Sequence, residues 1–287
     1  EGPETGTLTV FDGELPVLTY RFTDQLREGV DPRYTHSCYI HPLYSLDGKP
    51  LTEDFPADHY HHRGVFWTWA YVETRGVVTQ TWHPHVPPLR QKFVRWGERG
   101  VENGVARFTS ENVWVLDGRE EVAREVVTVR VHPSDGRSRA VYVELVLEAV
   151  GGPLVLKGTA EENKGYGGFC LRAAPWLKGA VLTTEAGRAT ADIVAQPHHW
   201  ADLSGEDSGT TSGVAIFVAP DHPAAPLSWL ARNSYTGFLN PSWPGGGRVE
   251  LKPGSPATLR YRIYVHRGDV EEGGVRQAWE AYTGAAR

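Results

Sequence analysis

The sequence predicts an all-β protein: a large antiparallel β-sandwich with one short C-terminal helix. Short runs rich in Val, Thr, Tyr, Phe and Trp recur along the 287 residues, and Gly, Pro and Asp separate them. Only one segment has helical spacing, and no internal repeat is visible. Because no break in composition divides the chain, we expect a single β-sandwich domain over residues 1–287.

The predicted strands run from the N-terminus almost to the end of the chain. They cover residues 7–11, 17–22, 64–72, 105–116, 123–132, 140–148, 154–159, 180–184, 213–218 and 257–266. In the last strand apolar and polar residues alternate, which predicts one face toward a core and one toward solvent. The dipeptides Asn103-Gly104 and Asp117-Gly118 are typical of tight turns and predict an antiparallel meander over residues 90–150.

One helix is expected over residues 269–282. Asp269 is a favoured N-cap residue, and acidic side chains follow it, where they favour a helix start. Four apolar residues recur at helical spacing, and they are Val275, Ala278, Trp279 and Tyr282. Gly284 follows as a stop signal.

Composition argues against several classes of partner. No stretch approaches the roughly 20 consecutive apolar residues of a membrane-spanning helix, so we expect no membrane partner. The chain has a net charge of −6 and contains no basic run, so we expect no nucleic-acid partner. Two cysteines, Cys38 and Cys170, are too few for a disulfide framework, and we expect both reduced and buried. We expect a soluble protein and favour the cytoplasm over export, although a chain that begins without Met could have lost a leader.

The clearest functional signal is a histidine cluster between a Pro-containing loop and an apolar strand. His59, His61 and His62 stand within four residues, with Asp58 before them and Arg63 after them. Loops at strand ends place functional side chains on a rigid scaffold. An imidazole beside a guanidinium suits proton transfer next to a bound anion or oxyanion. We therefore predict catalytic roles for His61, His62 and Arg63, and contact with the substrate for His59.

A metal site is an alternative interpretation of the same residues. If the backbone is extended, His59 and His61 point to one side and can supply two imidazoles. Zinc needs about four ligands, or three and a water, and the spacing identifies no third. We therefore expect no cofactor, with a divalent metal on His59 and His61 as the alternative. Upstream, His41 alternates with Tyr39; we predict that it contacts the substrate, with a half-buried strand-end histidine as the alternative.

Two further segments carry candidate substrate contacts. Glycines in residues 161–172 allow close approach to a ligand, and Tyr166 and Arg172 stand among them; a β-bulge with surface charges is the alternative. Residues 231–244 are expected to form a long irregular loop, and such loops are often functional. Its candidate contacts are Asn233, Tyr235 and Trp243.

Histidines also stand beside aromatic residues elsewhere. Residues 82–85 and 196–202 could line the same pocket, although each is also explained by a structural role. The ten tryptophans and twelve tyrosines suit both a core and a surface that stacks on sugar rings.

Several motifs together resemble a bacterial family catalogued as PmoA, or methane oxygenase PmoA, proteins. They are Tyr39-x-His41-Pro42-Leu43 with Gly48, residues 58–64, residues 166–172 and residues 259–268. The resemblance spans most of the chain and implies a soluble protein of unknown function, because a membrane oxygenase subunit needs spanning helices. It also implies a large sandwich, or supersandwich, similar to that of galactose mutarotases, although their catalytic His and Glu pair is not located by motif.

These observations predict a carbohydrate-active enzyme that acts on a small-molecule glycoside or sugar derivative. His61 or His62 would act as general acid or base, while Arg63 and Arg172 would bind developing negative charge or orient hydroxyls. Hydrolysis, β-elimination and epimerisation remain open. The alternatives are a non-catalytic carbohydrate-binding module and a His-ligated metal-dependent enzyme. A binding module presents a flat aromatic strip, whereas an enzyme gathers His, Arg and carboxylate in a concave pocket.

Overall fold

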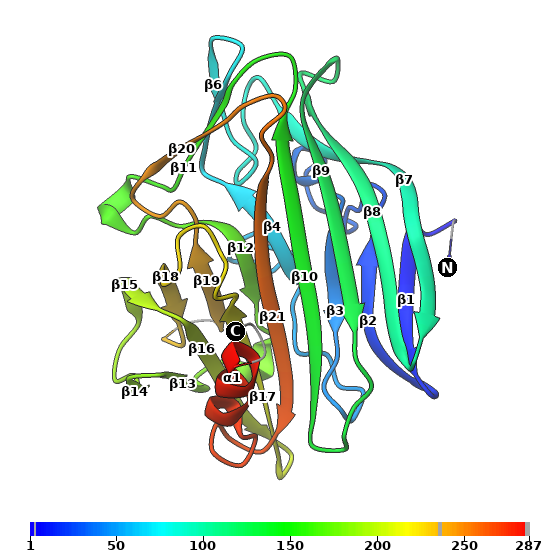
Figure 1. Ribbon diagram of the computed structural model, residues 1–287, viewed down its shortest axis with the longest axis vertical. Coiled ribbons are helices and arrows are strands. Elements are labelled where there is room, and N and C mark those ends of the chain that lie inside the picture. Colours follow the sequence, from blue (N-terminus) through cyan, green and yellow to red (C-terminus); the bar gives the residue numbers. More distant parts are fainter. Residues whose placement is uncertain (3, 235–236, 285–287) are drawn as a thin grey trace.

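The computed structural model describes residues 1–2, 4–234 and 237–284, and in this part of the chain antiparallel strands form three sheets (Figure 1). The all-β sandwich predicted from the alternating runs is confirmed. Cys38 and Cys170 are buried and unpaired with each other, as expected. No helix in the described residues has the length and apolar character needed to cross a bilayer.

The first sheet has eight strands and carries the candidate site. Its strands, in spatial order, are β1 (Thr7–Asp12), β2 (Leu15–Arg21), β3 (Tyr39–Leu43), β4 (Val65–Trp69), β12 (Gly167–Arg172), β19 (Phe238–Ser242), β18 (Leu227–Arg232) and β15 (Ile193–His198). Strands that are far apart in sequence are neighbours here, since β12 pairs with both β4 and β19. The centre of the sheet therefore joins three distant segments.

The second sheet has nine strands and the third has four. The second contains β14 (Gly187–Arg188), β13 (Val181–Thr184), β16 (Trp200–Asp207), β17 (Thr210–Val218), β21 (Ala257–Arg267), β10 (Ser138–Ala149), β9 (Glu120–Val131), β8 (Val105–Leu116) and β7 (Leu89–Glu102). The third contains β20 (Arg248–Leu251), β11 (Leu154–Lys157), β5 (Tyr71–Thr74) and β6 (Val77–Thr79). Strands β7 to β10 form the predicted meander.

The main core lies between the two large sheets. Along β10, Val141, Val143, Leu145 and Leu147 are buried and alternate with partly exposed residues. Burying each such side chain contributes about 1.5–3 kcal/mol. From the opposite sheet, Trp67 and Trp69 of β4 enter the same core. The outward-facing residues of β4 and its neighbours are therefore left to form a different surface.

A buried carboxylate ties the two large sheets together. Glu125 of β9 accepts hydrogen bonds from Trp67 Nε1 at 3.0 Å, Trp114 Nε1 at 3.0 Å, Gln91 Nε2 at 2.9 Å and Asn112 Nδ2 at 2.9 Å. Burial raises the pKa of Glu125, while these four donors oppose the rise. Because Trp67 comes from the first sheet and the others from the second, the carboxylate links the two layers.

Three predicted elements are wrong in their bounds. The helix α1 covers Val275–Gly284, not 269–282, because Gly274 has a positive φ of 63° and Asp269 accepts hydrogen bonds from an earlier turn. Residues 64–72 do not form one strand, since the chain leaves the first sheet after β4 and enters the third at β5. Residues 231–244 are not one long loop, because they include the end of β18 and all of β19.

Helix α1 covers the lower end of the second sheet, beside β17 and β21 (Figure 1). Its apolar residues pack on Trp200, Phe217 and Tyr264 of that sheet. This places the helix on the outer face of the second sheet, so it covers no part of the surface described next.

Candidate functional site

The outer face of the first sheet carries a second, smaller apolar cluster. Side chains alternate along a strand, so Phe66 of β4 points away from the core that Trp67 enters. Phe66 joins five other buried residues there, which are Tyr39, Trp82, Cys170, Leu230 and Phe238. They come from five strands or loops, and they form an apolar base on which polar side chains are held.

A pocket with a cavity volume of about 150 Å³ opens over this base. Its lining residues are His59, His61, His62, Trp82, His83, Glu161, Lys164, Tyr166, Leu230, Arg232 and Phe238. We call it the imidazole pocket, because four of its lining residues are histidines.

The histidine cluster forms a turn rather than an extended segment. The His62 main-chain N–H donates to the His59 carbonyl at 2.8 Å, which closes a turn of four residues. The rings of His59 and His62 consequently stack, with centroids 4.7 Å apart and planes at 9°. Phe238 stacks on His62 as well, at 4.9 Å and 14°. The interpretation based on an extended backbone, in which His62 would point away from His59, is therefore wrong.

His61 links this stack to a second segment. Its ring lies 4.5 Å from the ring of His62 and 3.9 Å from the ring of His83, between centroids. Burial, together with the smaller effects of the charges on His83 and His59, lowers the pKa of His61 to about 2. Burial likewise lowers the pKa of His83. These imidazoles are therefore neutral at neutral pH in the ligand-free protein.

Arg172 is hydrogen-bonded to His62 and to two carboxylates. The Arg172 side chain, 3% exposed, donates to Asp58 Oδ1 at 2.8 Å and to Glu53 Oε2 at 3.3 Å. Its Nη1 lies 3.3 Å from His62 Nδ1. A guanidinium has no acceptor, so His62 Nδ1 accepts and the ring hydrogen is assigned to Nε2. Burial lowers the pKa of His62 well below its ordinary value, and the neighbouring histidines and Arg172 add to this.

Arg63 holds the main chain of the same turn. Its guanidinium donates to the carbonyls of Tyr60 at 2.6 Å and His62 at 2.7 Å, and also to the Tyr34 carbonyl. It lies 3.7 Å above the ring centre of Phe55. Arg63 is only 1% exposed. Its contacts thus fix the backbone that carries His61 and His62.

Comparison with known proteins gives a family for this chain. The model of a family of unknown function, DUF6807, matches residues 7–280. The chain belongs to DUF6807. No curated protein matches it. The match carries neither an activity nor the PmoA name, so the PmoA resemblance and the likeness to galactose mutarotases stay predictions.

One solved structure similar to this DUF6807 chain is a heparinase III. The two are 9% identical, with a TM-score of 0.38 over 88% of this chain and 32% of the heparinase chain. The DUF6807 chain therefore spans about a third of that protein's length. A likeness this weak carries no argument about activity.

The other predicted substrate contacts of the DUF6807 protein fall in different places. Tyr166 lines the imidazole pocket, with its ring 4.5 Å from that of Trp82. His41 Nδ1 lies 3.0 Å from Thr52 Oγ1, and His41 is not among the lining residues. Asn233 Nδ2 donates to the Ala180 carbonyl at 2.8 Å, away from the pocket.

Trp243 and Tyr235 complete the predicted set. Trp243 is buried in the main core, edge-on to Trp69 with centroids 6.3 Å apart. Tyr235 lies outside the described residues.

The cluster at 82–85, which could line the same pocket, supplies Trp82 and His83 to its wall, and only folding brings His83 beside His61. Arg232 and Phe238 come from β18 and β19, within the candidate segment 231–244, but they were not among its predicted contacts. The other cluster, at 196–202, lies elsewhere, since Glu185 pairs with His198 at 3.4 Å and His199 at 3.2 Å.

A metal centre was the alternative for the histidine cluster. Within the described residues, no group of three or more His, Cys, Asp or Glu side chains is arranged to hold a metal ion. His59 and His61 have ring centroids 5.5 Å apart with planes at 68°, and His59 Nδ1 lies 3.0 Å from Asp58 Oδ2.

Proposed function

We propose that this DUF6807 protein is a carbohydrate-active enzyme that acts on a glycoside or sugar derivative in the imidazole pocket. One observation carries the proposal: four histidines and the carboxylate of Glu161 line one concave pocket together with aromatic rings. A hollow of this kind favours an enzyme over a binding module with a flat aromatic strip. The half-buried ring of Tyr166 suits stacking on a sugar ring.

His62 is the hydrogen-bond donor to the substrate in this proposal, and the protonated form of His61 returns the proton that His61 has taken. Because its Nδ1 accepts from Arg172, its Nε2 carries the hydrogen and can donate to a substrate oxygen. The stack between His59 and Phe238 holds the ring in one orientation. Pre-positioned donors cost no reorganisation during reaction, which is why they stabilise developing charge.

His61 is the proton acceptor. Its ring is neutral at neutral pH, so one of its nitrogens is an acceptor. It lines the pocket beside His62, so the two can act on neighbouring atoms of one substrate. Hydrolysis, β-elimination and epimerisation each need a proton removed and a proton returned. The choice among these three depends on the substrate.

Arg63 and Arg172 are positioning residues in this scheme. Arg63 fixes the main chain of the turn, and Arg172 fixes the tautomer of His62. Their guanidiniums act through the imidazoles, in contrast to the direct contact with substrate expected from the sequence.

The test is a comparison of His61→Ala and His62→Ala with the wild type. Turnover is measured on a panel of ordinary and oxidised glycosides, after wild-type activity has been established. Loss of a general acid or base lowers kcat by about 10²–10⁴-fold. His199→Ala, which removes an imidazole paired with Glu185 outside the pocket, is the matched control and should keep full activity. Unchanged turnover by both pocket variants would refute the mechanism; sugar binding without turnover by the wild type would favour the binding module.

A further inference from the structure

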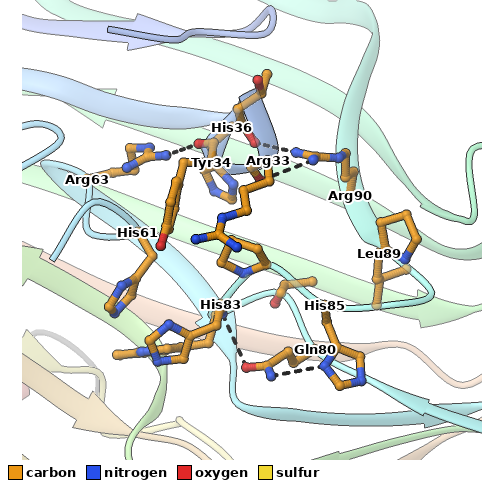
Figure 2. Close-up of a pocket in the computed structure, with 15 residues that line it drawn as sticks. Arg33, Tyr34, His36, His61, Arg63, Gln80, His83, His85, Leu89 and Arg90 are labelled. Atoms are coloured by element: carbon orange, nitrogen blue, oxygen red, sulfur yellow. Dashed lines mark hydrogen bonds between the residues drawn. The ribbon is translucent and has the colours of Figure 1, made fainter. Parts of the chain in front are cut away.

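A second pocket lies beside the imidazole pocket and shares part of its wall. Its cavity volume is about 80 Å³, and His61, Trp82 and His83 line both hollows. Its remaining walls are residues 33–36, the segment before β7, and the first residues of β7. Figure 2 shows the basic side chains gathered around this one hollow. We call it the arginine pocket.

The arginine pocket is lined by one sign of charge. Three arginines and four histidines line it, and none of its described lining residues is Asp or Glu. The basic residues are Arg33, Arg63, Arg90, His36, His61, His83 and His85. The whole chain carries a net charge of −6, so this hollow is opposite in sign to the protein average. Clefts lined by one sign of charge concentrate ligands of the other sign.

Arg33 and Arg90 keep much of their charge for a ligand, whereas Arg63 is only 1% exposed and its Nε lies 3.8 Å from Asp54 Oδ1. Arg33 Nε lies 3.4 Å from an Asp31 oxygen in an exposed pair, where solvent weakens the interaction. Arg90 donates instead to the main-chain carbonyls of Thr35 at 2.5 Å and Arg33 at 3.1 Å (Figure 2). Carbonyls orient a guanidinium without neutralising it. Arg90 is therefore held in place with its positive charge retained.

We propose that the arginine pocket binds an oxyanion, a carboxylate or a sulfate or phosphate ester, carried by the sugar derivative that occupies the imidazole pocket. The inference rests on the proposed function and narrows its substrate to acidic sugars. A guanidinium can donate two parallel hydrogen bonds to two oxygens of a carboxylate, a sulfate ester or a phosphate ester. The shared wall, which includes His61, places the bound charge next to the proposed base.

This arrangement also explains how such weakly basic imidazoles act. Burial and neighbouring positive charge lower the pKa values of His61 and His83 in the empty site. A bound anion raises the pKa of a neighbouring histidine, because it favours the protonated form. The acidic substrate therefore strengthens the base that acts on it, whereas a neutral sugar leaves that base weak.

Calorimetric binding to the full chain tests the inference without requiring turnover. The probes are disaccharides that contain glucuronate, galacturonate or a 6-sulfated hexose, their neutral counterparts, and inorganic sulfate. We expect at least one acidic disaccharide to bind about tenfold more tightly than its neutral counterpart, and the preference to shrink as NaCl is raised. Equal affinity for acidic and neutral sugars, no sugar binding, or inorganic sulfate bound as tightly as any acidic sugar would each overturn the inference.

Charge-removing variants locate the binding to this pocket. Arg33→Gln and Arg90→Gln should each weaken the acidic ligand by about three- to tenfold and leave neutral sugars unaffected. Arg33 is exposed, so its variant folds even if Arg90→Gln does not. Arg95→Gln, on the same strand as Arg90 but paired with Glu111, is the matched control. Undiminished affinity in Arg33→Gln and in a folded Arg90→Gln refutes the assignment. Acidic preference without any turnover would instead refute the proposed enzyme and leave this inference standing.

Discussion

Replacing Arg172 by leucine is the sharpest test of how the imidazole pocket is held. Leucine keeps apolar volume at a position that is almost fully buried, but it removes the charge that faces Glu53 and Asp58. It also removes the donor to His62 Nδ1. The variant therefore separates the electrostatic role of Arg172 from simple packing at the end of β12.

The cost follows from the exposure of the partners. Leaving a fully buried charge unpaired costs about 3–5 kcal/mol. The Glu53 side chain is 25% exposed, so leaving its carboxylate without a partner costs less, about 1–2 kcal/mol. Asp58 is 39% exposed and well screened, which reduces its share to less than about 1 kcal/mol. The lost hydrogen bond to His62 adds about 1 kcal/mol. We expect Arg172→Leu to lower the free energy of unfolding by about 2–4 kcal/mol at pH 7.5.

The cost should depend on pH with a defined sign. Burial would raise the pKa of Asp58, but hydrogen bonds from Arg172 and His59 outweigh it and hold that pKa below its ordinary value. Burial raises the pKa of Glu53, and Arg172 opposes the rise. Stability from a carboxylate with a lowered pKa is present above its unfolded value, about 4, and is lost as the pH falls. The difference between wild type and Arg172→Leu should therefore persist down to about pH 4 and shrink as the pH falls from about 4 to about 3.

Urea unfolding followed by tryptophan fluorescence at about pH 7.5, 4 and 3 measures both effects. Arg172→Lys, which keeps the charge but not the fork, should fall between the leucine variant and the wild type. A leucine variant with an unchanged urea midpoint at pH 7.5, or with a cost independent of pH, would show that these ion pairs do not hold the turn.

Two other predictions concern the scaffold. Glu125→Leu removes the carboxylate that accepts from four buried N–H donors, so it should lower the free energy of unfolding by about 3–5 kcal/mol. Glu125→Gln should lower it by less, and urea titrations measure both variants; a leucine variant as stable as the wild type contradicts this. Gly168→Ala should cost about 1–3 kcal/mol, since φ is +88° and a Cβ would lie 3.1 Å from the Trp243 carbonyl oxygen. Gly100→Ala, where a Cβ would meet no atom within 4 Å, is the control, and an equal cost at both positions would refute the argument.

Local structure was largely predictable because its causes are local. The meander of β7 to β10 follows from alternation and from two turns, and Asn103, Gly104, Asp117 and Gly118 all adopt the positive φ that such turns require. The helix was misplaced because acidic residues after Asp269 resemble a helix start. Gly273 and Gly274 delay the helix, and a Cβ at Gly273 would lie 2.1 Å from the His266 ring.

The sequence by itself determined the fold class and selected the histidines at 59–62 as candidate site residues, since strand alternation and a short motif are properties of neighbouring residues. Only the tertiary structure decided which distant residues contact these histidines. Arg172 reaches His62 across 110 residues, and Phe238 reaches it from β19, because β12 lies between β4 and β19 in the first sheet. Strand order depends on long-range pairing between distant segments, which no local pattern of residues encodes.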